Sequence, residues 1–158
     1  MTRIENREML NQISEQTKKI IDSSKCRILI CAGTGCLAGG SATIFEKMVA
    51  LSSDNGKVDV SFGPEIAHPE GMVHVHKSGC HGFCEMGPLM RIEPQGILYI
   101  KVKPEDCEEI YEKTVLKGEV IDRLLYKQDG QTFQKQEEIP FYKRQTRLVL
   151  KNCGHIDA

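Results

Sequence analysis

Two pairs of cysteines, each set among glycines, constrain this chain more than any other feature. Cys31 and Cys36 are separated by Ala-Gly-Thr-Gly, and Cys80 and Cys84 are separated by His-Gly-Phe. Thiolates are the soft ligands of zinc and of iron–sulfur clusters. Structural zinc usually takes pairs separated by two to four residues around one ion. The four- and three-residue gaps here lie at the wide end of that range and can place one pair on each iron of a two-iron cluster, so the wide spacing favours [2Fe–2S].

The glycines next to these cysteines indicate how an anionic cluster is stabilised. Gly33 and Gly35 in the first loop, and Gly82 in the second, are able to adopt positive φ at no steric cost. Successive backbone N–H groups can then turn toward the cluster sulfurs. We therefore predict Gly33, Thr34, Gly35 and Gly82 as cofactor-binding residues.

Length and composition exclude several other classes of protein. The chain has 158 residues with 21 basic and 22 acidic side chains, enough for one medium domain. Balanced charge and few aromatic residues argue against nucleic-acid binding. No apolar run approaches a membrane span, and the polar start is not a signal peptide. Seven cysteines without a secretory signal predict reduced thiols in the cytoplasm.

The order of the expected elements predicts an α/β fold. Apolar residues at helical spacing indicate an N-terminal amphipathic helix within residues 1–24. Alternating or buried patterns, turn residues and helix caps then predict, in order, a strand at 27–31, a helix at 44–54, strands at 57–62 and 73–76, a hairpin at 89–102 and a helix at 104–118. This order is typical of a thioredoxin-like domain, with a mixed sheet and flanking helices, over residues 25–126.

The last part of the chain has a different character. Residues 128–138 are polar, Ile139 to Tyr142 has no local core partner, and Leu148 to Leu150 is a strand-like fragment with nothing to pair with. Residues 127–158 therefore read as a C-terminal linker and the start of a following domain that is absent from this sequence.

The two cysteine segments, residues 31–36 and 79–88, resemble the thioredoxin-like [2Fe–2S] ferredoxin domain. More narrowly, they are similar to its version at the N-terminus of the flavoprotein subunit of NAD(P)-linked, often electron-bifurcating, iron-only hydrogenases and of NADH:quinone oxidoreductases. Residues 139–145 and 150–154 are similar to the junction where the FMN- and NADH-binding domain begins.

The resemblance spans roughly residues 25–156 and implies four metal ligands, Cys31, Cys36, Cys80 and Cys84. It also implies an electron-transfer module that works with other redox subunits of a larger oxidoreductase complex. FMN, NAD(P)H and further iron–sulfur clusters would belong only to the full-length protein or complex. The chain has no positions that match those sites.

Four other interpretations account for part of the sequence. Gly33 to Ala38 fits the dinucleotide-binding fingerprint, but Asp59 lies inside its strand and the second cysteine pair stays unexplained. Thiol–disulfide exchange favours Cys-x-x-Cys, which neither pair has. A structural four-cysteine zinc site and a docking module without redox turnover stay open, and analysis for iron and acid-labile sulfide separates zinc from the cluster.

The remaining cysteines and histidines have plainer expected roles. We expect the other three cysteines to be small buried hydrophobic residues: Cys26, Cys107 and Cys153. His81, between two predicted ligands, is expected at a solvated rim, and His74 and His76 are expected on a polar surface. Phe83 fits either a cluster shield or ordinary core.

Overall fold

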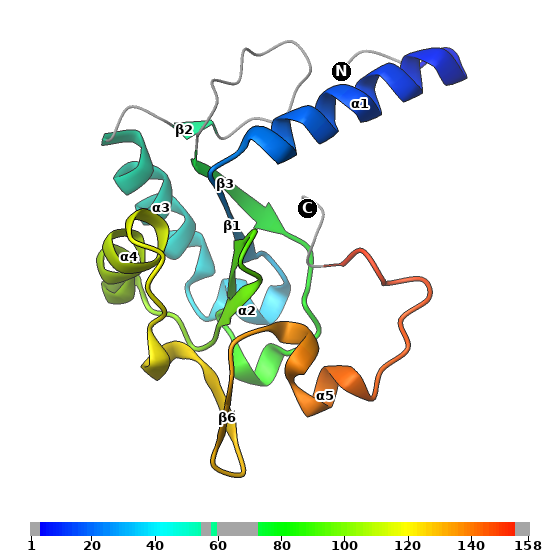
Figure 1. Cartoon of the computed structure of the whole chain (residues 1–158). Coiled ribbons are helices and arrows are strands. Elements are labelled where there is room, and N and C mark those ends of the chain that lie inside the picture. Colours follow the sequence, from blue (N-terminus) through cyan, green and yellow to red (C-terminus); the bar gives the residue numbers. More distant parts are fainter. Residues whose placement is uncertain (1–3, 55–57, 60–72, 154–158) are drawn as a thin grey trace.

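Figure 1 shows the computed structural model of the chain, which describes residues 4–54, 58–59 and 73–153. Within those residues a five-stranded sheet has the order β2-β3-β1-β4-β5. The strands are β1 (Cys26–Cys31), β2 (Val58–Asp59), β3 (Val73–Ser78), β4 (Met90–Glu93) and β5 (Ile97–Tyr99). β3 is parallel to β1 and β2, whereas β4 is antiparallel to β1 and β5. The predicted α/β fold with a mixed sheet is confirmed.

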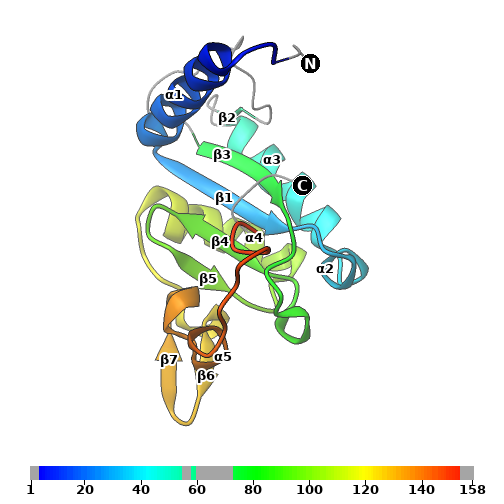
Figure 2. The same cartoon turned by 90° about the vertical axis from the view of Figure 1, so that its right-hand side faces the viewer.

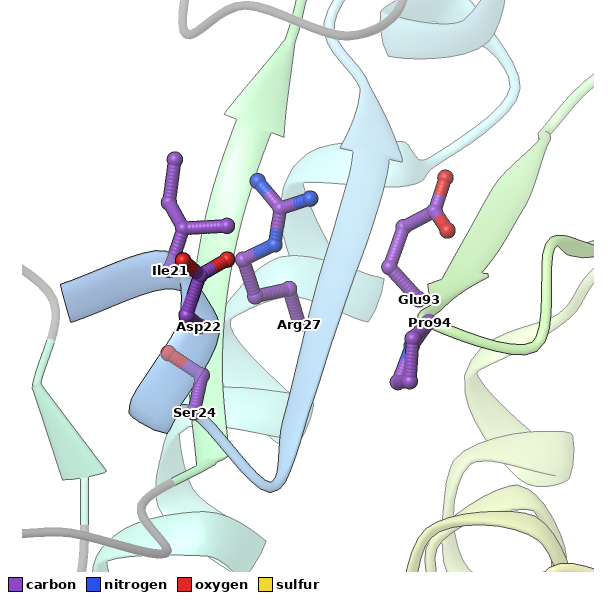
Figure 3. Close-up of a pocket in the computed structure, with 6 residues that line it drawn as sticks. All are labelled: Ile21, Asp22, Ser24, Arg27, Glu93 and Pro94. Carbon is purple, nitrogen blue, oxygen red and sulfur yellow. The ribbon is translucent and has the colours of Figure 1, made fainter. Parts of the chain in front are cut away.

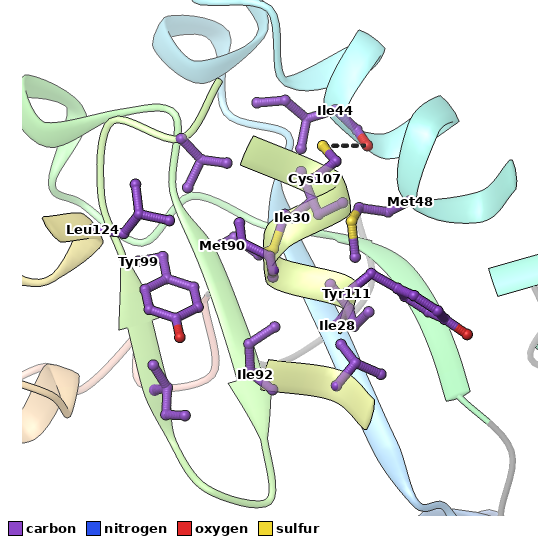
Figure 4. Packing of buried hydrophobic residues seen from close by; sticks show 14 of the residues in the cluster. Ile28, Ile30, Ile44, Met48, Met90, Ile92, Tyr99, Cys107, Tyr111 and Leu124 are labelled. Atoms are coloured by element: carbon purple, nitrogen blue, oxygen red, sulfur yellow. Dashed lines mark hydrogen bonds between the residues drawn. The ribbon is translucent and has the colours of Figure 1, made fainter. Parts of the chain in front are cut away.

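Two helical segments cover one face of this sheet. α3 (Ser41–Asp54) lies beside α4 (Cys107–Glu109), which continues as a π-helical stretch over Ile110–Leu116. Alternate residues of a strand share a face, so Ile28 and Ile30 of β1 both point into the layer beneath these helices. Figure 4 shows this core, to which β4, β5 and the helices contribute Met90, Ile92, Tyr99, Ile44, Met48 and Tyr111.

The predicted N-terminal helix is present as α1 (Arg7–Ser23). The Asn6 side chain caps it by accepting a 2.8 Å hydrogen bond from the Met9 N–H. Met9, Ile13, Thr17 and Ile21 form a half-buried stripe, whereas Leu10 is 49% exposed. The helix extends away from the sheet, as both views show (Figures 1 and 2). None of the described helices combines the length and apolar character needed to cross a bilayer.

The predicted polar surface at His74 and His76 is wrong. Both side chains are buried, with exposed fractions of 2% and 4%. β3 lies between β1 and β2 in the sheet, and the two imidazole rings stack with their centres 6.0 Å apart. Of the neighbouring strand predicted at residues 57–62, only Val58–Asp59 is seen, and the rest lies outside the described residues.

The segment predicted as a linker begins with ordered structure. β6 (Tyr126–Gln128) and β7 (Gln131–Phe133) form a hairpin, joined at Asp129 and Gly130, which have φ of 52° and 76°. The chain then runs beside β5, where the Leu98 N–H donates to the Gln134 carbonyl over 2.9 Å. A short 3-10 turn (Gln136–Glu138) and α5 (Pro140–Lys143) follow (Figure 2).

The expectation that Ile139 to Tyr142 lacks a core partner is therefore wrong. Ile139 is 1% exposed and belongs to a second hydrophobic cluster with Cys31, Cys36, Phe83, Leu89 and Leu98. Leu148, Val149 and Leu150, by contrast, are exposed by 79%, 93% and 59%. The division of the chain into residues 1–24, 25–126 and 127–158, with a further domain after the last, stays a prediction.

Candidate functional site

The two cysteine-bearing loops meet because their strands are neighbours. β1 ends at Cys31 and β3 ends at Ser78, and these two residues are paired in the parallel register. Both loops consequently leave the sheet at the same end (Figure 2). The first loop leads into α2 (Thr34–Ala38), which contains Cys36, and the second carries Cys80 and Cys84.

The structure brings all four predicted ligands together. Cys80 Sγ lies 3.9 Å from Cys84 Sγ. A β-carbon on Gly33 would lie 3.3 Å from Cys80 Sγ and 3.6 Å from Cys31 Sγ, and Cys31 shares a buried cluster with Cys36. Cys31 and Cys36 are each 1% exposed, whereas Cys80 and Cys84 are exposed. The site therefore has a buried pair on its inner side and an exposed pair on its outer side.

Backbone N–H groups point at these sulfur atoms. The Gly82 N–H donates to Cys80 Sγ over 3.3 Å. The N–H groups of Gly33 and His81 act to lower the pKa of Cys31, and that of Leu89 acts to lower the pKa of Cys36. Such donors stabilise negative charge on sulfur. Of the four predicted cofactor-binding residues, Gly33 and Gly82 thus direct N–H groups at sulfur, and the cofactor-binding role of the set stays a prediction.

The pKa values of the thiols follow from these contacts. The hydrogen bond from Cys36, together with the backbone N–H groups of His81 and Gly33, lowers the pKa of Cys31 to about 6. The pKa of Cys36 is raised because its thiol donates to Cys31 and because it is buried. Its hydrogen bond with Cys80 raises the pKa of Cys84. The site thus favours a thiolate already at Cys31, the state in which cysteine binds metal.

The glycines act mainly through space rather than through positive φ. Gly33 has φ of −63°, and a β-carbon there would lie 3.3 Å from Cys80 Sγ and 3.6 Å from Cys31 Sγ. A β-carbon on Gly35 would lie 3.5 Å from Cys84 Cβ, an ordinary contact, so lack of space does not by itself require a glycine there. The expectation of positive φ is met at Gly82, with φ of 76°, and is wrong for Gly33 and Gly35. Thr34 starts α2 with an exposed side chain.

One further glycine was missed by sequence reasoning. A β-carbon on Gly87 would lie 2.8 Å from Cys36 Sγ and 3.3 Å from the Cys84 carbonyl oxygen. Gly87 therefore lets the chain after the second cysteine pair pass directly against the first pair. Its place three residues after Cys84 was the available signal.

His81 is buried rather than on a solvated rim, with an exposed fraction of 0%. Its Nε2 lies 2.9 Å from Ser78 Oγ, and its Nδ1 lies 3.2 Å from Gln136 Oε1. The same Gln136 oxygen accepts a 3.2 Å hydrogen bond from Arg91. The C-terminal segment supplies this cover, so the rim prediction was wrong because it left that segment unpacked.

The C-terminal segment also holds the backbone of the second loop. The His81 carbonyl accepts hydrogen bonds from Tyr142 Oη and Arg147 Nη2, each 3.0 Å long. Beside it, Phe83 is 7% exposed and lies against Tyr126, Phe141 and Tyr142, at ring-centre distances of 5.2, 5.0 and 5.5 Å. Phe83 is therefore part of an aromatic cluster next to the cysteines.

The other cysteines lie away from the site. Cys26 and Cys107 are buried as predicted, and burial raises their pKa values to about 12 and about 11. Figure 4 shows the Cys107 thiol donating to the Ile44 carbonyl oxygen, 4.0 Å away. Cys153 is only half-buried.

A separate pocket lies between α1, β1 and β4. Its cavity volume is about 280 Å³, and Figure 3 shows its lining residues Ile21, Asp22, Ser24, Arg27, Glu93 and Pro94. None of the four clustered cysteines lines this pocket.

The donor set fits a two-iron cluster. Four thiols lie as two neighbouring pairs, with N–H donors on three of the sulfur atoms and glycines that leave the space between the loops open. Within the described residues, no three His, Cys, Asp or Glu side chains are arranged around a single metal ion. Two pairs of thiolates are what two bridged irons require.

Comparisons with known proteins agree with this geometry. The family model of the thioredoxin-like [2Fe–2S] ferredoxins matches residues 19–115. A 2Fe–2S ferredoxin of Clostridium pasteurianum is 42% identical over 102 residues, covering 63% of this chain and 94% of that protein. One from Aquifex aeolicus (strain VF5) is 46% identical over 48 residues, covering 30% and 43%.

Solved structures show the same fold. The wild-type thioredoxin-like [2Fe–2S] ferredoxin of Aquifex aeolicus has a TM-score of 0.50 at 25% identity, covering 65% of this chain and 97% of that chain. A cysteine-to-serine variant of that ferredoxin has a TM-score of 0.51 at 23% identity, covering 65% and 99%. This chain belongs to the thioredoxin-like [2Fe–2S] ferredoxins and is an electron carrier with a [2Fe–2S] cluster as its cofactor.

Proposed function

We propose that Cys31, Cys36, Cys80 and Cys84 are the four cluster ligands, with the first two on one iron and the last two on the other. The observation that carries this assignment is the meeting of the two loops at the ends of the paired strands β1 and β3. The 3.9 Å distance between Cys80 Sγ and Cys84 Sγ supports their assignment to one metal ion.

The chain's own residues set the conditions for electron transfer. The bound cluster would supply reversible one-electron chemistry, with no bond made or broken in a substrate. The N–H groups of Gly33, His81, Leu89 and Gly82 stabilise negative charge on the sulfurs, which makes reduction easier. Phe83 and Ile139 keep water from the inner side. The exposed cysteine pair is the side from which electrons enter and leave.

Anaerobic reconstitution with iron and sulfide tests the ligand set. We expect about two irons and two sulfides per chain in the wild type, following the cluster's composition. Cys36→Ser should lose or strongly alter the visible absorbance and the EPR signal of the reduced protein, whereas Cys107→Ser should keep both. Zinc without sulfide, or an unchanged spectrum in Cys36→Ser, would contradict the assignment.

We further propose that this carrier works in the cytoplasm within an NAD(P)H-linked oxidoreductase of the hydrogenase or NADH dehydrogenase type. Its partners would be redox subunits that carry FMN and other iron–sulfur clusters. Support comes from the likeness of residues 139–145 and 150–154 to the segment that precedes an FMN- and NADH-binding domain.

Isolation of the native assembly tests this context. The protein should copurify at low salt with FMN-containing polypeptides, and NADH or NADPH should bleach its visible spectrum in that preparation. A preparation that contains no flavin, or that neither nucleotide reduces, would refute the proposed complex while leaving the electron-carrier function intact.

A further inference from the structure

A groove beside the exposed cysteine pair is lined by cations. Its volume is about 360 Å³, and Lys143, Arg147 and Lys151 line it. None of the three forms a salt bridge with an acidic side chain among the described residues. Glu137 is the acidic residue in the lining, and its carboxylate pairs with Arg91 over 2.9 Å. The groove is therefore a site of unneutralised positive charge.

This charge lies next to the predicted route of electrons. Arg147 Nη2 donates to the His81 carbonyl. A β-carbon on Gly82 would lie 2.7 Å from the same Arg147 nitrogen. Both residues belong to the loop between Cys80 and Cys84, the two exposed cysteines. A molecule bound in the groove would therefore touch the outer side of the cluster site.

Exposed apolar residues continue the same surface. Leu148, Val149 and Leu150 lie between Arg147 and Lys151 in the chain and are exposed by 79%, 93% and 59%. From residue 139 to residue 153 the chain has four basic residues and no acidic one. Apolar contacts surrounded by charges of one sign are typical of a protein interface, in which charge complementarity selects the partner.

We infer that this cationic face, formed by Lys143, Arg147 and Lys151 together with Leu148, Val149 and Leu150, docks the acidic surface of a redox partner protein. The inference rests on the proposed electron-transfer function and adds the charge of the partner and the place where it binds. Opposite charge steers such a partner to the exposed cysteines and raises the association rate. The short apolar patch suits a small, transient interface of the kind used by redox proteins.

Two forms of one probe test the sign of this field. Native cytochrome c is basic, and its succinylated form is acidic because carboxylates replace the lysine amines. The dithionite-reduced, cluster-loaded full chain is mixed with either ferric form, so that one electron leaves this protein and one haem iron becomes ferrous. With the acidic probe, the second-order rate constant should fall about tenfold from 20 to 300 mM NaCl, as charges become screened. With the basic probe it should not fall.

Matched charge reversals test whether the groove lysines are the source of the attraction for the acidic probe. Lys143→Glu combined with Lys151→Glu should lower the rate with the acidic probe about tenfold at 20 mM NaCl and flatten its salt dependence. Lys18→Glu combined with Lys19→Glu changes the net charge equally on α1, none of whose residues lines the groove, and should lower the rate constant less than twofold.

Each other outcome overturns the proposal in a distinct way. Equal losses in the two double variants would show a net-charge effect without a docking site. Inhibition by 5 mM inorganic phosphate at constant ionic strength would show that the groove takes a small anion. Absence of electron transfer to either probe would refute the electron-carrier function itself, and the docking face with it.

Discussion

Replacing Ile139 with alanine tests whether the C-terminal segment belongs to the core that surrounds the cysteines. The Ile139 side chain is 1% exposed and shares a hydrophobic cluster with Cys31, Cys36, Phe83 and Leu98. The change removes three buried carbons, a transfer loss of about 2.4 kcal/mol at ~0.8 kcal/mol each. A residual cavity adds to this loss, so we expect a decrease of about 3 kcal/mol in the free energy of unfolding.

The rate of anaerobic unfolding of the cluster-loaded chain in urea, followed by far-ultraviolet circular dichroism, reports this loss. Because cluster release makes unfolding irreversible, the rate of bleaching of the visible band is the second readout. A loss of 3 kcal/mol corresponds to bleaching up to about 100-fold faster. The control is Val149→Ala, a 93% exposed residue of the same segment, which should stay within about 0.5 kcal/mol of the wild type.

If Ile139→Ala behaves like Val149→Ala in both measurements, Ile139 does not belong to the core around the cysteines. That result would mean that residues 126–143 contribute nothing to the stability of the cysteine site. The interpretation of this segment as a free linker would then stand.

Three further substitutions test the contact between the two cysteine loops, the C-terminal segment and the hydrophobic core. Gly87 has a φ of −72°, which alanine also adopts, but the alanine β-carbon would lie 2.8 Å from Cys36 Sγ. In Gly87→Ala the cluster content, measured by visible absorbance, should therefore fall by at least about half. Tyr142→Phe removes the 3.0 Å hydrogen bond to the His81 carbonyl and should cost about 1 kcal/mol in urea unfolding; no change would make that bond dispensable. Burial raises the pKa of Cys107 from 9.0 to about 11, so the folded state holds this proton more tightly than the unfolded state. This contribution to the free energy of unfolding is complete below pH 9 and is lost as pH rises to about 11. Cys107→Ala should therefore reduce the decline in the free energy of unfolding between pH 8 and pH 11. An unchanged decline would contradict the burial effect.

The centre of the fold and the cysteine site could be predicted from the sequence because both depend on short-range patterns. Strands next to the cysteines have alternating or continuous apolar residues, and a parallel pair of strands brings their following loops to one edge. Cys31 and Cys80 are therefore brought together by features that lie within a few residues of each. Gly33 was identified for the same reason, although its role is close approach rather than positive φ.

The packing of the C-terminal segment, residues 126–143, over the site could not be predicted in this way, since it depends on contacts between residues far apart in the sequence. Gln136 reaches His81 across 55 positions, and Tyr142 reaches the same residue across 61. Neither residue carries a local signal for such a contact. One local signal was overlooked: Asp129-Gly130 favours a two-residue β-turn and marks the hairpin with which the cover begins.

The unequal exposure of the two cysteine pairs connects the cover with function. A cluster buried on all sides exchanges electrons slowly with another protein, and one open on all sides loses its protection from water. Phe83 and Ile139 close the inner side, where Cys31 and Cys36 are 1% exposed, and leave Cys80 and Cys84 open. The same C-terminal segment then continues into Arg147 and its cationic neighbours at the open edge. The C-terminal segment thus helps to seal the site on one side and, on the docking proposal, selects by charge what approaches the other.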